Sequence, residues 1–240
     1  MASAFPNTIK TFTTKVNGVD DVDATHINSV QEEITAMETE LIAGHREGWI
    51  PASGTWTYAS ATTFTVAGNL TAYFGVGTKI RLTQGGGYKY FYVVSSSYSA
   101  PNTTVTVVAD GANTLASAGI ANNYFSYADC PVGFPAWFNW TPSWTGLTAV
   151  GAVTTAGIFN IVGRMVKFKA TVTAATSTAA TAVTTYIGNP PISPIGYDVV
   201  LATDTNVSTI GTSLSAPNRL YVPTWSARAG FVILSGTYQI

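Results

Sequence analysis

The chain has 240 residues and a mass of 25.2 kDa, a length that suits one large domain or two small ones. Hydrophobic residues make up 46% of it, charged residues only 10%, and the net charge is -1, so neither a disordered chain nor a basic nucleic-acid-binding protein is expected. The first residues have no basic region before an apolar run, and no apolar run reaches the roughly 18 residues of a membrane span. We therefore expect no Sec-type signal peptide and no membrane insertion.

Cys130 is the only cysteine, which excludes an intrachain disulfide and a cysteine-based metal cluster. We expect it to be a small buried apolar residue. The sequence indicates no cofactor and no resident metal ion.

Residues 20–48 are unlike the rest of the chain, because they hold eight of the twelve acidic residues and both histidines. Within them, apolar residues recur at spacings of 3, 4, 3 and 4, which is the a/d pattern of a coiled coil. Asp23 or Thr25 is a suitable N-cap, and Gly44 lies near the expected end, so we predict a helix of about five turns. The seam residues of this helix are Ile27, Val30, Ile34, Met37 and Leu41.

Two interpretations of this helix are open: it lies on its own domain, or it associates with copies of itself. We favour self-association, because Ile, Val and Met at the seam are compatible with more than two strands and a short helix is marginal alone. The flanking acids Glu33, Glu38 and Glu40 have no basic partners on the helix. A parallel bundle would therefore carry some like-charge repulsion and be held mainly by the part that follows it.

From residue 49 the period changes from 3.5 to 2, with segments rich in β-branched and aromatic residues. Residues 49–128 predict a small antiparallel β domain, in which the glycines of 84–88 form a hairpin loop rather than a phosphate cradle. Residues 129–144 contain three Pro and three Trp and indicate a packed linker. Residues 145–240 predict a second β domain, a sandwich or jelly roll, in which 171–185 forms either an edge strand and a loop or a strand against a symmetry-related copy. The fold class is mainly β.

Several segments together resemble the fibre and other small structural proteins of tailed bacteriophages. They are FPNTIKTFTTKVNG (5–18), WTYASATTFTV (56–66), GFPAWFNWTPSWTG (133–146) and SGTYQI (235–240). The resemblance covers nearly the whole chain and is one of texture and segment order. It implies a homotrimeric virion component that attaches to tail, baseplate or capsid proteins through residues 1–48 and carries distal β domains. It brings no catalytic residues with it.

Beyond residue 48 the only carboxylates are Asp110, Asp129, Asp198 and Asp204, and there is no histidine. This excludes Ser-His-Asp and Cys-His catalysis in the β body unless a helical histidine reaches it. Nothing in the spacing of the aspartates suggests a glycosidase pair either. We expect Asp198 and Asp204 to cap turns or lie in solvent, with a Ca²⁺ site as the alternative. The sequence thus predicts a non-enzymatic protein.

Three aromatic residues near loops or strand ends are candidates for stacking on a host cell-surface polysaccharide: Tyr186, Tyr197 and Trp225. A place in the core is the alternative for each. The basic residues Lys79, Arg81 and Lys89 are expected on solvated strand faces, with a weak patch for an anionic polymer as the alternative.

The function expected from these observations is that of a trimeric phage fibre that presents its C-terminal β domain for receptor binding. A capsid head fibre or decoration protein is the first alternative, and a free carbohydrate-binding module is a further one. An enzyme such as a depolymerase is disfavoured, because acids and histidines are scarce in the body of the protein.

Overall fold

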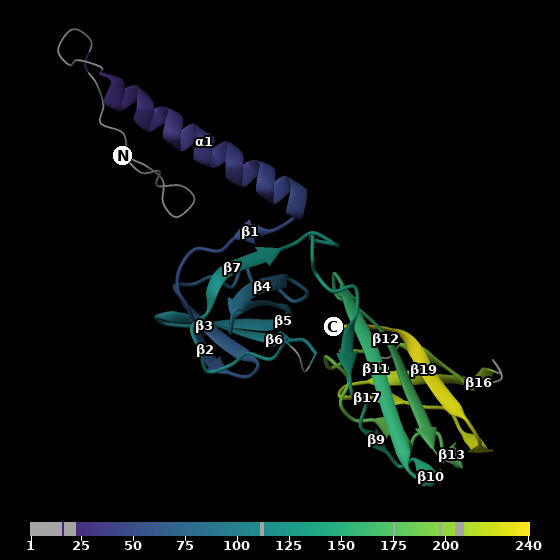
Figure 1. Ribbon diagram of the computed structural model, residues 1–240. Helices are drawn as coiled ribbons and strands as arrows, with labels where there is room; N and C mark the ends of the chain where they lie inside the picture. The colour runs from purple at the N-terminus through teal and green to yellow at the C-terminus, as the bar shows by residue number, and fades with distance from the viewer. Residues whose placement is uncertain (1–15, 17–22, 111–112, 175, 197, 205–208) are drawn as a thin grey trace.

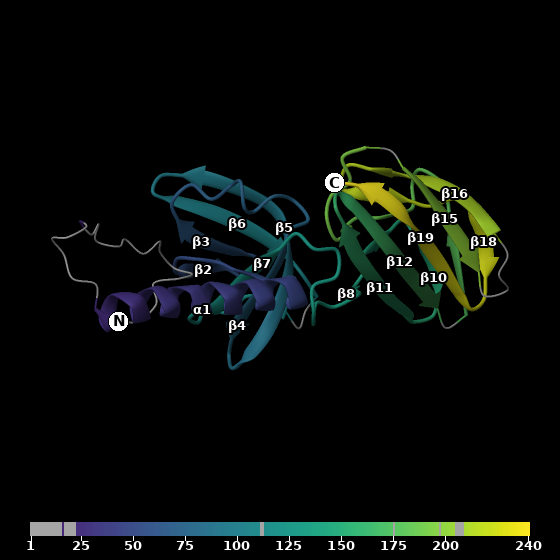
Figure 2. The ribbon, with the colours of Figure 1, turned by 90° about the horizontal axis from the view of Figure 1, so that it is seen from above.

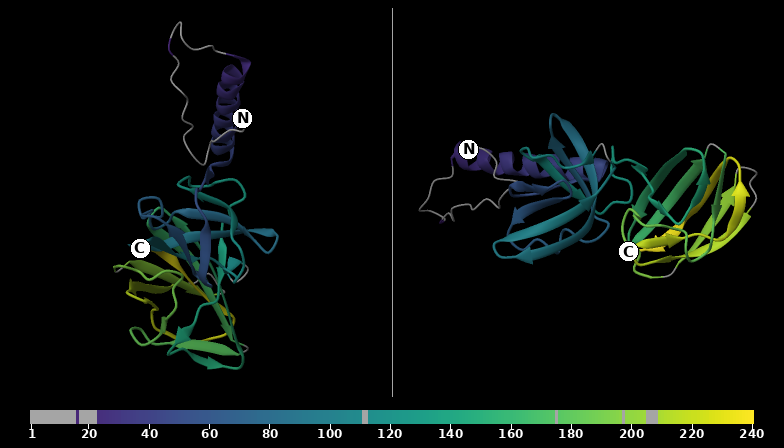
Figure 3. Two further views of the ribbon diagram at one scale, coloured as in Figure 1. Left: turned by 90° about the vertical axis from the view of Figure 1, so that its left-hand side faces the viewer. Right: turned by 90° about the horizontal axis from the view of Figure 1, so that it is seen from below.

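The computed structural model describes residue 16 and residues 23–110, 113–174, 176–196, 198–204 and 209–240. The described chain is mainly β and has one helix, α1 (Ala24–Glu47). The helix stands off one side of a first β domain, and a second β domain lies on the other side (Figure 1 and the left view of Figure 3). The predicted order of a helical head followed by β structure is confirmed.

Asp23 caps the start of α1, as its place before the apolar repeat predicts. The backbone N–H of His26 donates to Oδ1 of Asp23 at 3.2 Å, and the backbone N–H of Asp23 donates to Nδ1 of His26 at 3.4 Å. This reciprocal pair is a capping box in which histidine replaces the usual Glu or Gln. It lowers the pKa of Asp23, chiefly through the backbone hydrogen bond from His26.

The first β domain is one antiparallel sheet of seven strands in the order β1-β7-β4-β5-β6-β3-β2. The glycine loop predicted at 84–88 is a hairpin: Gln84 pairs with Gly87, and Gly85 and Gly86 both have positive φ, as a tight two-residue turn requires. The strands are β1 (Ile50–Pro51), β2 (Trp56–Ser60), β3 (Thr63–Ala67), β4 (Lys79–Gln84), β5 (Gly87–Ser99), β6 (Asn102–Val108) and β7 (Ala121–Ser126).

The core of this domain forms from the inward positions of alternating strands. On β3 the side chains of Phe64 and Val66 are buried, while their neighbours are partly exposed. The ring of Trp56 stacks on that of Phe64 with centroids 4.4 Å apart, and Phe74 meets both rings edge-on. The domain thus buries its apolar face within a single chain.

The second β domain contains a nine-stranded sheet in the order β8-β11-β12-β19-β15-β16-β17-β14-β9 and a three-stranded sheet in the order β10-β13-β18. Their strands are β8 (Phe138–Trp140), β9 (Trp144–Thr145), β10 (Thr148–Val150), β11 (Val153–Val162), β12 (Met165–Ala174), β13 (Ser177–Ala180), β14 (Tyr186–Ile187), β15 (Val199–Asp204), β16 (Thr209–Ala216), β17 (Arg219–Tyr221), β18 (Trp225–Arg228) and β19 (Phe231–Gln239).

One core serves this whole domain. It joins Phe159 and Phe168, from one half of the long sheet, to Ile187 and Leu220, from the other half. The sheet must therefore curl over its own inner face, and Figure 2 shows the strands wrapping round in this way. Trp225 of the three-stranded sheet belongs to the same core.

Two details of the second domain differ from the sequence expectations. The range 129–144, expected to be a linker, contains β8, which pairs with β11 and adds Phe138 to the core. The range 171–185 was expected to supply an edge strand, but β13 lies between β10 and β18 and pairs with both. Its residues are small enough to fit beneath the long sheet, so small size here indicates close packing of layers rather than an edge.

The two β domains meet through close backbone and aromatic contact. Tyr92 of β5 lies in the core cluster of the second domain, and Phe134 packs edge-on against it with centroids 4.9 Å apart. A Cβ added to Gly77 would fall against the carbonyl oxygen of Gly163. The junction therefore requires glycine at residue 77, where φ is +84°.

Candidate functional site

The predicted seam of α1 is an exposed apolar face. The side chains of Ile27, Val30, Ile34, Met37 and Leu41 are exposed by 43% to 62%. Ser29 and Glu33, which share one helix face beside the seam, are only 6% and 7% exposed. The helix therefore does not lie with its apolar seam on its own β domain, which was the alternative interpretation. Such a face is unfavourable in water unless another molecule covers it.

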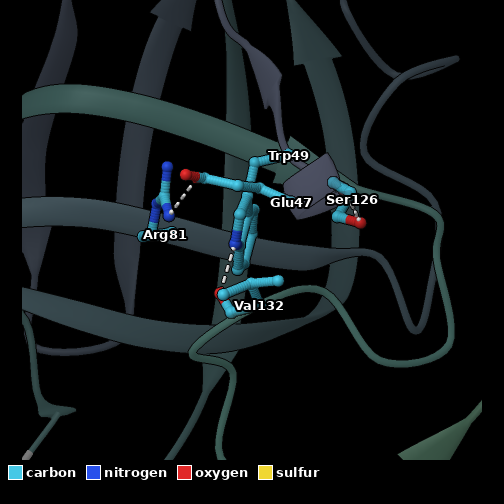
Figure 4. Close-up of polar contacts among 6 residues, drawn as sticks. Glu47, Trp49, Arg81, Ser126 and Val132 are labelled. Atoms are coloured by element: carbon cyan, nitrogen blue, oxygen red, sulfur yellow. Dashed lines mark hydrogen bonds and ion pairs between the residues drawn. The ribbon is translucent and has the colours of Figure 1, made fainter. Parts of the chain in front are cut away.

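The end of α1 is fixed to the first β domain through its last residue and the two that follow (Figure 4). The carbonyl of Glu47 accepts from the backbone N–H of Val132 at 2.8 Å, and the carbonyl of Gly48 accepts from the Ser126 hydroxyl at 2.5 Å. The Trp49 indole N–H donates to the carbonyl of Val132 at 2.8 Å. Three hydrogen bonds therefore hold the direction in which the helix leaves the body.

Gly48 makes this close approach possible. Its φ is +72°, a region that favours glycine, and a Cβ at this position would lie 3.2 Å from Cβ of Ala128. The chain thus leaves the helix through a left-handed residue that is packed against the segment after β7.

Arg81 is the centre of the same junction. Its guanidinium lies over three rings, with its Cζ 4.8 Å from the centroid of Trp49, 5.0 Å from that of Tyr88 and 4.3 Å from that of Tyr124. Its Nη1 also lies 3.4 Å from Oε2 of Glu47. Cation–π contact and a partly buried ion pair together keep a cation stable at 9% exposure and link the helix to β4.

Lys79 and Arg81 are not on the solvated strand faces expected for them, and the alternative, a basic patch on strands β4 and β5, does not form either. Lys79 and Arg81 are 5% and 9% exposed, and Nζ of Lys89 donates to the carbonyl of Thr114 at 2.6 Å. Burial lowers the pKa of Lys79, an effect that the charge of Asp129 partly opposes. Nζ of Lys79 lies 5.8 Å from the ring centroid of Tyr92 and 5.9 Å from that of Phe134, so aromatic rings of the junction surround this buried amine.

The three predicted ligand-binding rings do not form a common site. Trp225 is 3% exposed and its indole N–H points to Oγ1 of Thr178 at 3.4 Å, so it is a core residue. Tyr186 is half-buried beneath the guanidinium of Arg219, whose Cζ lies 4.5 Å from the ring centroid. Tyr197 lies outside the described residues.

The described residues offer little for covalent or metal chemistry. No group of three His, Cys, Asp or Glu side chains among them could hold a metal ion. Oδ2 of Asp198 accepts from the backbone N–H of Gln239 at 2.9 Å, so this carboxylate joins the residue before β15 to the end of β19 and does not cap a local turn as expected. Cys130 was expected to be buried but is exposed, because it lies in the loop before the aromatic junction rather than in a strand. Within the described part of the chain, no helix has the length and apolarity needed to cross a bilayer.

The sequence predicted the seam of α1, but not the junction of Arg81 and Trp49 that fixes the direction of the helix. The available signal was the alternation of β4, which puts Lys79 and Arg81 on the same side of the strand, next to a segment rich in aromatic residues. Two basic residues on one face between aromatic strands indicate a buried cation site as readily as a solvated face.

Comparison of the chain with protein-family models, with curated proteins and with solved structures finds no match in any of the three.

Proposed function

We propose that this protein is a non-enzymatic bacteriophage virion component, a homotrimeric fibre that attaches through residues 1–48 and presents its C-terminal β domain for binding to the host surface. The observation that carries this proposal is the exposed seam of α1. Five apolar side chains at coiled-coil spacing are exposed by 43% to 62% in the single chain. Identical helices placed side by side would cover them.

The arrangement of the chain supports the same proposal. The helix leaves the first β domain on the side away from the second, so bundled helices would leave the C-terminal domains at the opposite end (Figure 1). The fixed joint at Glu47, Gly48 and Trp49 would give each copy the same angle between helix and body. Only 10% of the residues in the chain are charged, so its surface has little charge repulsion. Such a surface suits a sandwich-like domain within a hydrogen-bonded assembly better than a free cytosolic protein.

The test is the mass of the purified protein measured by light scattering, which we expect to be near three times 25.2 kDa. Ile34→Asp puts a charge into the seam and should shift the mass towards that of the monomer. Thr35→Asp is the matched control, because it adds the same charge at an exposed position beside the seam and should leave the trimer intact. A wild-type protein that is monomeric at every concentration would contradict the proposal.

A second experiment separates a virion fibre from a free carbohydrate-binding module. Deletion of residues 1–48 should abolish incorporation into particles if the helix is the attachment part. A free module would keep its binding without this region and would have no particle to enter.

A further inference from the structure

An open hollow of about 650 Å³ lies where the two β domains meet, and neither of the sites described above uses it. Its walls come from the end of β6, from β8, from β11 and from the segment after β14. Ligand sites in proteins commonly have volumes of roughly 300 to 1,000 Å³ and occur at domain boundaries. The hollow therefore has the size and the place of a small-ligand site.

The lining of the hollow is uncharged and combines apolar residues with a few polar ones. None of the residues that line it is Asp, Glu, Lys, Arg or His. Its polar side chains are amides and hydroxyls, including Asn139, Thr141 and Thr155. A charged ligand would lose hydration there and find no opposite charge, so the lining selects against phosphates, carboxylates and amines.

Trp140 gives the hollow a flat aromatic wall. Its ring rests on Gly157, where an added Cβ would lie 2.5 Å from Cε3 of the indole and 3.1 Å from Cγ of Pro142. The indole N–H donates to the carbonyl of Asn189 at 2.8 Å, which fixes the orientation of the ring. The ring is half-buried, and it lines the hollow together with the edge of the sheet.

The wall opposite the sheet is held by one amide side chain. Nδ2 of Asn189 donates to the carbonyl of Thr141 at 2.9 Å, and its Oδ1 accepts from the backbone N–H of Ser143 at 2.5 Å. Asn189 thereby ties the segment after β14 to the segment after β8. The hollow is thus a preorganised site, because its aromatic ring and both of its flanking segments are already fixed.

We propose that this hollow binds a neutral saccharide unit. The C–H face of a sugar ring would pack on Trp140, and its hydroxyls would exchange hydrogen bonds with Thr155 and Asn189, which also line the hollow. An uncharged ring with both an apolar face and many hydroxyls matches an uncharged lining in which an indole and other apolar residues lie beside amides and hydroxyls. This inference rests on the proposed function of binding to the host surface. It adds to that function a class of ligand, neutral saccharides, and a site, the hollow between the two β domains.

The experiment is saturation-transfer NMR on the full-length protein with the methyl glycosides of glucose, galactose, mannose, rhamnose, N-acetylglucosamine and N-acetylgalactosamine. We expect at least one of them to bind with a dissociation constant of about 1 mM, and glucuronate and glucosamine to give no signal. Trp140→Ala should abolish the signal. Trp137→Ala should retain it, because Trp137 is an exposed tryptophan on the same segment that does not line the hollow.

Thr155→Val keeps the test informative if the Trp140 variant does not fold. Valine has nearly the shape of threonine and lacks only its hydroxyl, so this variant should leave the melting temperature nearly unchanged and weaken binding roughly tenfold. Failure of all six glycosides to bind at about 50 mM, or equal binding by the Trp140→Ala variant, would refute the saccharide site. Light scattering on the same samples separates the two proposals: a monomer that binds sugar refutes only the fibre, and a trimer that binds none refutes only this site.

Discussion

The helix and the β body contain the same kinds of apolar residue, but the body buries these residues and the helix exposes them. In the first β domain Ile80, Leu82 and Val93 are completely buried, whereas Ile34 and Leu41 of α1 are 45% and 62% exposed. The β body therefore satisfies its hydrophobic residues within one chain, and the helix does not. The difference teaches that the body completes its apolar core within one chain, whereas the helix leaves an apolar face that the proposed trimer would cover.

The largest effect should come from the body. Phe64→Ala removes a fully buried ring that stacks on Trp56, so we expect a loss of about 3–5 kcal/mol in the free energy of unfolding. Chemical denaturation of the full-length protein would measure it, and the loss should not depend on protein concentration. Ile34→Ala is the matched truncation in the helix, and it should change the concentration dependence of association instead. Equal behaviour of the two variants would remove the contrast between body and helix.

The next effect should come from the junction of the two β domains. Gly77→Ala places a methyl group against the carbonyl of Gly163 and also strains a residue with φ of +84°. We expect a loss of about 2–3 kcal/mol and separate unfolding transitions for the two domains, measured by calorimetry. Gly68→Ala is the control, because Gly68 has a similar φ of +89° but no atom within 4 Å of the added Cβ. A similar loss in both variants would show that strain alone, and not domain contact, is being measured.

A smaller effect of opposite sign should come from the buried amine of Lys79. Burial holds its pKa below the usual 10.5, so the unfolded chain binds the proton more strongly than the folded one. The charge therefore destabilises the fold at neutral pH, and this effect fades as pH rises from the folded pKa towards 10.5. Lys79→Met should stabilise the protein by about 1 kcal/mol at pH 7, with a smaller gain at pH 10. A gain that stays constant with pH would point to packing rather than charge.

The smallest effect should be confined to the helix. The folded pKa of Asp23 is lowered by its hydrogen bond from His26, so its contribution is present above the unfolded pKa of about 3.8 and is lost as pH falls through the folded value. Circular dichroism at 222 nm should show helix loss below about pH 4, while the β body keeps its structure. Asp23→Ala should show the lower helix content at neutral pH already and lose this acid transition. An unchanged acid transition in the variant would assign it to other carboxylates.

The sequence allowed prediction of those features that depend on local chemistry. The structure contains the helix predicted from the spacing of Ile27, Val30 and Ile34, the cap at Asp23 and the hairpin turn at Gly85 and Gly86. Each of these features depends only on residues close in the chain. The helix runs longer than expected, because the residues between Gly44 and Glu47 continue it up to the glycine at residue 48.

What could not be predicted depends on contacts between distant residues. Arg81 meets Glu47 across 34 positions, and Trp140 meets Asn189 across 49. Whether Trp225 points inward is set by the pairing of β18 with β13, and no periodicity within its short strand records this. The residues predicted to stack on a saccharide lie near loops in the sequence. Trp140, which lines the hollow, lies instead on the edge strand β8, inside the range expected to be a linker.

The joint at Glu47, Gly48 and Trp49 also has a mechanical meaning. If the helix is held and the C-terminal domain is pulled, the tension passes through this joint before it reaches the sheets. There it meets three hydrogen bonds and the two-residue strand β1, whereas the pair of β11 and β12 is joined along ten residues. The joint should therefore yield first and let the body swivel under load, with both β domains still folded.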